Sequence, residues 1–198
     1  MKHPRHSDDL SKRLRVRPFF LFPATAAVKN PVSFLLPSVG TIVFLVIFLG
    51  LVCLGNNATL LGDTDTGYHI RAGEVILDTF SVPRYDIFSF HSPALPWTAH
   101  EWLSEVIMAL VHRAFGLTGI VVFFSFIIAL TYYLLFKILR TPNSNIVLTI
   151  ALVGLVIASS TLHWLARPHV FSWVFVLIYQ YLLDSFQYRN RNYLYVLP

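Results

Sequence analysis

Long apolar runs separated by short polar segments make up most of this chain. Four of them are long enough, or nearly so, to cross a bilayer, at about residues 32–55, 117–139, 146–162 and 170–183. A helix needs about 20 apolar residues to span the hydrocarbon core, and a helix satisfies its own backbone polar groups there. The pattern therefore predicts an all-α integral membrane protein with about four transmembrane helices. The start of a fifth apolar run follows near Tyr193.

A long polar segment, residues 56–116, separates the first two runs and is predicted to be an outer loop. Within it, residues 66–80 and 99–115 have the apolar spacing of helices, and the second can lie in the plane of the interface. The intervening prolines predict an extended, turn-rich connection. Gly116 is expected to separate the second of these juxtamembrane helices from the span that follows it.

The composition supports the membrane assignment. Hydrophobic residues make up 56% of the 198 positions and charged residues 13%, whereas a soluble domain carries about 25% charged residues. The single cysteine, Cys53, excludes a disulfide framework. A signal peptide is disfavoured because the first apolar run is too long and no cleavage site follows it.

The basic residues predict the orientation. Residues 1–31 form a basic tail with seven of the fifteen Lys and Arg residues, which favours a cytoplasmic N-terminus over nucleic-acid binding. Four spans then leave eleven basic residues inside and four outside. The same topology brings the 56–116 loop and the 163–169 turn to one extracytoplasmic face.

Ionisable residues concentrate in these two segments. Such groups are costly at a membrane boundary unless they are paired, hydrated or used. A carboxylate can deprotonate an acceptor hydroxyl, and the arginine fork suits a leaving phosphate. Asp-x-Asp also offers the oxygen ligands that Mg²⁺ or Mn²⁺ prefers. The candidate residues are Asp63, Asp65, His69, Arg71, His100, Glu101, Glu105, His163, Arg167 and His169.

Structural roles compete with the functional ones at the start of the loop. Asp65 or Thr66 can serve as the N-cap of the following helix. Arg71 can pair with Glu74 or Asp78 on its own helix.

The same holds farther along the chain. Glu101 and Glu105 fit a solvated helix face better than a catalytic pair. Arg167, which precedes Pro168, can extend to the interface while its stem stays in the apolar layer.

Several short motifs of the loop and the turn resemble the GT-C superfamily of polytopic glycosyltransferases, which use polyprenyl-phosphate-linked sugars. The similarity extends over residues 60–185 and is greatest to bacterial members of uncharacterised function. The matching elements are Asp63-Thr64-Asp65, His69-Ile70, Gly73, Val82-Pro83, Asp86-Ile87-Phe88-Ser89, Pro96-Trp97, His100-Glu101-Trp102-Leu103 and Arg167-Pro168-His169.

The resemblance implies a GT-C-like fold whose first outer loop carries two juxtamembrane helices and a catalytic acid. That acid is Asp65 by first choice and Asp63 by second, and both are the implied ligands of a Mg²⁺ or Mn²⁺ ion. Asp65 and Arg71 have the spacing of the acid and arginine in the oligosaccharyltransferase catalytic subunit. The Asp-Glu pair of other members is missing here, which leaves metal dependence open.

The resemblance also implies the roles of the other candidates. The donor phosphate would be bound by four residues, and two more would support the acceptor. The phosphate set is Arg71, His69, Arg167 and His169, and the acceptor or supporting set is Glu101 and His100.

The expected function is transfer of a sugar from a polyprenyl-phosphate donor to an acceptor on the extracytoplasmic face of a bacterial inner membrane. The expected partners are membrane lipid, the lipid-linked sugar and envelope-glycan assembly proteins, with no nucleic acid. Because the family has more spans, residues 32–198 are expected to be the N-terminal part of a larger enzyme or a truncated gene product. The alternatives are a non-catalytic GT-C-like scaffold and a transporter, which the apolar middles of the spans disfavour.

Overall fold

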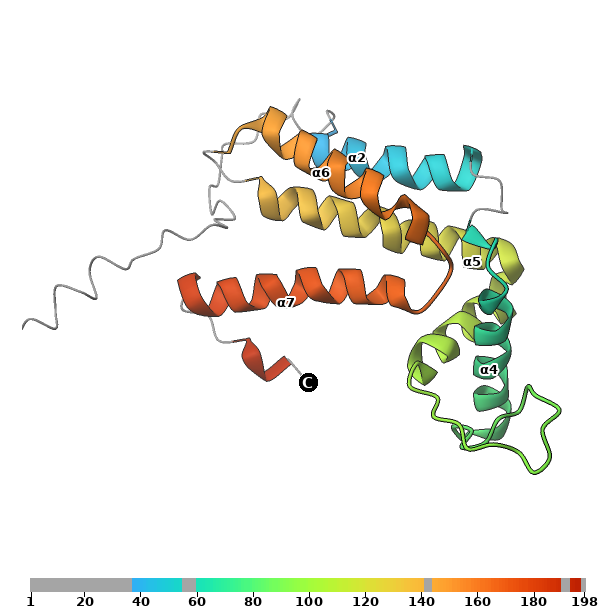
Figure 1. Cartoon of the computed structure of the whole chain (residues 1–198). Helices are drawn as coiled ribbons and strands as arrows, with labels where there is room; N and C mark the ends of the chain where they lie inside the picture. The colour runs from blue at the N-terminus through green and yellow to red at the C-terminus, as the bar shows by residue number, and fades with distance from the viewer. Residues whose placement is uncertain (1–36, 55–59, 141–143, 190–192, 197–198) are drawn as a thin grey trace, which may run out of the picture.

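The structure, a computed structural model, describes residues 37–54, 60–140, 144–189 and 193–196, with only the backbone of residues 188, 189 and 194 (Figure 1). Over these residues the chain is helical, and its one β-type contact is an isolated bridge. The elements are α2 (Val39–Leu49), the π-helical turn η2 (Gly50–Leu54), α4 (Asp65–Thr79), α5 (Trp102–Leu139), α6 (Ile146–Ser160), the 3-10 turn η3 (Thr161–His163), α7 (His169–Arg189) and the 3-10 turn η4 (Leu194–Val196). The predicted all-α class is therefore confirmed.

Three helical segments of the described chain are long and apolar enough to cross a membrane. They are Trp102–Leu139, Ile146–His163 and His169–Gln187. The first predicted span appears as the shorter apolar helix Val39–Leu54, and the start of that span lies outside the described residues, as does the basic tail. The count of four spans and the start of a fifth therefore stays a prediction.

Helix α5 is the central element of the bundle, because α2, α4, α6 and α7 all pack against it. In Figure 1, α2 and α6 lie on one side of its second half and α7 on the other. The core along this half includes Phe124, Ile128 and Tyr132, whose side chains are almost fully buried. In a bilayer such side chains stabilise the bundle by van der Waals packing, because lipid tails are as apolar as the side chains themselves.

Gly116 breaks α5 as the sequence predicts. Its backbone has φ 63° and ψ −160°, a non-helical conformation within the element. Only glycine adopts such angles without strain, because it has no Cβ. The kink lets the first part of α5 turn away from the bundle toward α4 (Figure 1).

The predicted start of α5 at Ala99 is wrong by three residues, since the helix begins at Trp102 with Glu101 as its N-cap. Residues 98–101 form a turn instead, in which the His100 amide donates to the Thr98 carbonyl at 2.9 Å. The apolar spacing extends into this turn and does not mark the boundary.

Helix α4 lies unusually close to the first part of α5. A Cβ atom on Gly73 would stand 2.0 Å from the Glu105 carbonyl oxygen and 2.9 Å from the Ala109 Cβ atom. Ala72 and Ala109 are fully buried beside this contact. Small residues at the crossing thus allow the two backbones to touch.

The connection between α4 and α5 is extended and turn-rich, as predicted, and it folds back on itself. The Asp86 amide donates to the Leu95 carbonyl, and the Trp97 amide to the Arg84 carbonyl, each at 2.8 Å. The Phe88 ring packs edge-on against Trp97 and against Tyr68 of α4, with centroids 5.8 and 5.3 Å apart. These rings hold the connection against the face of α4 that carries the candidate site.

Replacing Gly73 by alanine tests the close helix contact. We expect Gly73→Ala to lower the free energy of unfolding by about 1–3 kcal/mol, the usual effect of overpacking, because its methyl group would overlap the Glu105 backbone. Gly67→Ala on the same helix is the control, since a Cβ there meets nothing within 4 Å and alanine favours the helix by about 1 kcal/mol. Unfolding of the purified protein in detergent measures both, and equal stability of the two variants would contradict the contact.

Candidate functional site

The segment before α4 is attached to the turn before α7. The Ala166 amide donates to the Leu60 carbonyl at 2.9 Å, and the Thr66 hydroxyl donates to the Ala166 carbonyl at 3.2 Å. Thr66 and Ala166 are both buried, and they are 100 residues apart in the sequence. These bonds bring together the two polar segments that the predicted topology places on one face.

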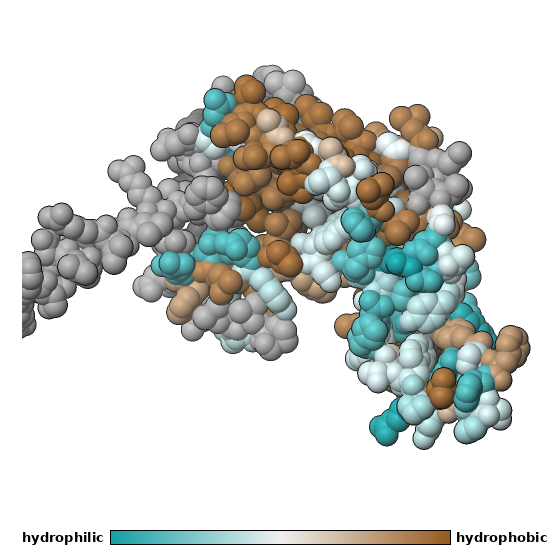
Figure 2. Space-filling model, in the orientation of Figure 1, coloured by the Kyte–Doolittle hydropathy of each residue, from teal (hydrophilic) through white to brown (hydrophobic). Residues whose placement is uncertain are grey.

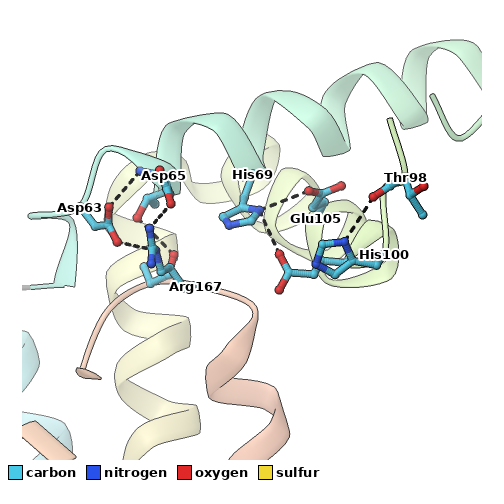
Figure 3. A network of polar contacts seen from close by, with 10 residues as sticks. Asp63, Asp65, His69, Thr98, His100, Glu105 and Arg167 are labelled. Atoms are coloured by element: carbon cyan, nitrogen blue, oxygen red, sulfur yellow. Dashed lines mark hydrogen bonds and ion pairs between the residues drawn. The ribbon is translucent and has the colours of Figure 1, made fainter. Parts of the chain in front are cut away.

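An acid–arginine cluster forms at this junction (Figure 3). The Arg167 guanidinium pairs with Asp63 through Nε and with Asp65 through Nη2. The side chains differ in accessibility, since Asp63 is 18% exposed and Asp65 is 48% exposed. Arg167 is therefore held by two acids, and Asp65 keeps the wider access to solvent.

Capping of α4 differs from both predicted alternatives. Thr64 is the N-cap residue and makes no capping bond with its side chain. The Asp63 carboxylate accepts the Asp65 amide at 3.2 Å instead. Asp63 therefore stabilises the start of α4 and orients Arg167 at the same time.

The predicted Mg²⁺ or Mn²⁺ ion at Asp63 and Asp65 stays a prediction. Both carboxylates already face the guanidinium of Arg167. A cation that used these oxygens would first have to displace Arg167, because like charges repel at such short range.

A second cluster lies one turn farther along α4 and is largely buried. Nδ1 of His69 is 3.2 Å from Oε1 of Glu105 and 3.8 Å from Oε2 of Glu101. The side chains of His69 and Glu105 are 6% and 1% exposed, and that of Glu101 is 33% exposed. Oε2 of Glu105 is buried without a partner within strict hydrogen-bond geometry.

The solvated face expected for Glu101 and Glu105 is therefore wrong for Glu105. The contact at Gly73 lays α4 over this part of α5 and covers the Glu105 side chain. Helical spacing identifies the polar face of α5, but not the helix that packs against it.

Tyr68 borders the buried cluster. Its ring centroid lies 4.3 Å from that of His69. Partial burial, together with the negative charges of Glu105 and Glu101, raises the pKa of the Tyr68 phenol to about 12. The raised pKa reflects the burial of the phenol and the two acids beside it.

Arg71 points away from these clusters. It pairs with Glu74 at 3.0 Å, and its side chain is 62% exposed. It lies about 200° around the helix from His69, because successive residues rotate by about 100°. The alternative of a pair with Glu74 is thus confirmed, and the predicted phosphate-binding role of Arg71 stays a prediction.

The remaining candidate histidines make local contacts. His169 Nε2 donates to the His163 carbonyl at 3.0 Å, and its ring lies 5.5 Å from that of Trp173. His100 Nδ1 donates to the Thr98 carbonyl at 3.2 Å. Neither contact involves the acid–arginine cluster.

The kink of α5 borders an apolar cavity. Its volume is about 580 Å³, and its lining joins α2 to both sides of Gly116. The lining residues are Phe48, Val111, Phe115, Thr118, Gly119, Val122, Phe123 and Phe126.

Hydrophilic and hydrophobic residues are unevenly distributed over the surface. In Figure 2, hydrophilic residues gather over α4 and its connections, and hydrophobic residues dominate over α2 and α6. The acid–arginine cluster joins the start of α4 to the turn before α7, a helix long and apolar enough to cross a membrane.

Comparison of the chain with protein-family models, curated proteins and solved structures found no match. The function is therefore inferred from the residues and their geometry.

Titration of Tyr68 tests the environment of the buried cluster. The tyrosinate absorbance that is present in the wild type and missing in Tyr68→Phe should develop with a midpoint near pH 12, above the ordinary value of 10.0. Since the folded state keeps a proton that the unfolded state loses, this group lowers stability as the pH rises from about 10 toward 12. The control is the difference in absorbance between the wild type and Tyr85→Phe, which reports an exposed tyrosine. A Tyr68 midpoint near pH 10 would show that the acids of the buried cluster do not surround the phenol.

Proposed function

We propose that this protein is a membrane glycosyltransferase that moves a sugar from a polyprenyl-phosphate donor to an acceptor hydroxyl. The observation that carries the proposal is the cluster in which Arg167 joins Asp63 and Asp65. It combines a base and a phosphate-binding cation at one partly exposed point, beside helices long enough to cross a membrane.

Asp65 is the proposed general base. Its side chain is about half exposed, so an acceptor hydroxyl can approach its carboxylate. The hydroxyl oxygen attacks the anomeric carbon while its proton passes to Asp65. The bond from that carbon to the phosphate oxygen breaks, and the phosphate leaves with the electron pair, which inverts the anomeric centre.

Arg167 is the group proposed to stabilise the leaving phosphate. Guanidinium carries five N–H donors in a planar fork, and the two ion pairs engage Nε and Nη2. The Arg167 side chain is 30% exposed, and arginine forms strong charge-assisted bonds with phosphate oxygens. Asp63, which is more buried, acts as a positioning residue that fixes Arg167.

The apolar cavity at the α5 kink supports a lipid-linked donor, because its lining suits an isoprenoid chain. The distribution of basic residues supports a cytoplasmic N-terminus and a reaction on the outer face of a bacterial inner membrane. The phosphate-binding role of His69, Arg71 and His169 and the acceptor role of Glu101 and His100 stay predictions outside this proposal, because their contacts lie away from the acid–arginine cluster.

Substitution of Asp65 by asparagine tests the proposed base. Membranes carrying the protein are supplied with polyprenyl-phosphate-linked mannose, glucose or arabinose, and released polyprenyl phosphate is measured. We expect Asp65→Asn to reduce the rate about 10²–10⁴-fold, the usual contribution of a general base. Asp78→Asn neutralises another exposed acid of α4, which pairs with Arg113 of α5, and it should leave the rate within about twofold, as expected of a surface change.

Equal rates for Asp65→Asn and the wild type would exclude Asp65 as the base. Absence of release by the wild type with all three donors would favour the non-catalytic scaffold. Movement of a solute through reconstituted vesicles that is unaffected by Asp65→Asn would favour the transporter.

A further inference from the structure

We propose that His69, Glu101 and Glu105 form a binding site for one divalent transition-metal ion, of the class of Zn²⁺ or Mn²⁺. This site is separate from the acid–arginine cluster and does not depend on the proposed glycosyltransferase activity.

The spacing of the three side chains fits coordination of a single ion. Metal–ligand distances of about 2.0–2.2 Å separate neighbouring ligand atoms by about 3.0–3.5 Å. Nδ1 of His69 lies 3.2 Å from Oε1 of Glu105 and 3.8 Å from Oε2 of Glu101, and the three ligand atoms all lie within 4.8 Å of one another. Small side-chain rotations are enough to close this set around an ion.

The buried carboxylate of Glu105 points to a ligand independently of the spacing. Its side chain is 1% exposed, and Oε1 faces His69. The second oxygen, Oε2, has no partner within strict hydrogen-bond geometry, and among the contacts described above only the Tyr68 phenol and His69 interact with this carboxylate as donors. A buried polar atom without a partner is costly, and coordination of an ion would compensate for the loss of solvent at this carboxylate.

The arrangement is held in place by the two helices. His69 and Gly73 lie one turn apart on α4, and Gly73 contacts the backbone of Glu105. Glu101 and Glu105 also lie one turn apart, so both can face the same ion. Glu101 is 33% exposed, which leaves the ion a route from solvent.

The chemistry of the three ligands selects the class of metal. Imidazole nitrogen favours Zn²⁺ and its transition-metal neighbours, whereas Mg²⁺ and Ca²⁺ prefer oxygen ligands alone. One histidine and two glutamates supply three ligands, and zinc sites with three protein ligands keep a position open for water or substrate. The site is therefore better suited to Zn²⁺ or Mn²⁺ than to Mg²⁺.

Metal binding by the purified full chain tests this proposal. The protein is stripped with a chelator and titrated with Zn²⁺, Mn²⁺ or Mg²⁺, and bound metal is counted by elemental analysis. We expect one equivalent of Zn²⁺ or Mn²⁺ and weaker binding of Mg²⁺. His69→Gln and Glu105→Gln should each weaken Zn²⁺ binding by at least about 10-fold to 100-fold, because loss of a supporting residue alone has that effect.

A second histidine–glutamate contact between the same two helices provides matched controls. His112 and Glu74 lie 3.5 Å apart and are more exposed, so His112→Gln and Glu74→Gln should keep full metal binding. Glu101→Gln, at a partly exposed position, is the alternative variant if Glu105→Gln does not fold. It should also weaken binding.

Three results would overturn the proposal. The first is a stripped wild-type protein that takes up no Zn²⁺ and no Mn²⁺. The second is unchanged binding in folded His69→Gln and Glu101→Gln. The third is binding that is lost in Asp63→Asn but kept in His69→Gln, which would assign the ion to the acid–arginine cluster.

Discussion

Gly73 allows the backbone of α4 to lie directly against that of α5 at Glu105, and the polar region of the protein depends on this contact. With any larger residue the two helices would have to move apart, since a Cβ would stand 2.0 Å from the Glu105 carbonyl oxygen. The same approach covers Glu105 and brings His69, one turn from Gly73, to its carboxylate. The kink at Gly116 complements the contact, because it turns this part of α5 toward α4.

Charged groups in this region are stabilised by pairing across long sequence separations. Arg167 pairs with Asp63, which lies just before α4, and with Asp65, the first residue of α4. His69 lies close to Glu101 and Glu105 at the start of α5. Ionisable side chains at a membrane boundary are costly without such partners. The pairing therefore accounts for the stability of a polar region beside apolar helices, and the partial exposure of Asp65 and Glu101 leaves both clusters accessible to ligands.

The two proposals assign different chemistry to neighbouring turns of α4. The acid–arginine cluster combines a carboxylate with a guanidinium, which suits proton transfer and phosphate binding. The buried histidine–glutamate cluster contains an imidazole and two carboxylates, which suits a transition metal. Because they share no side chain, substitutions in one cluster can be compared directly with substitutions in the other.

The sequence by itself determined the helical class, the apolar helices, the turn-rich connection and the break at Gly116. These are local properties, set by the length and period of apolar runs and by the backbone freedom of glycine. Only the tertiary structure decided that Glu105 is buried beside His69 and that Arg167 joins Asp63 to Asp65. Helical period identifies the faces of a helix, but the partner of each face depends on contacts between residues far apart in the chain.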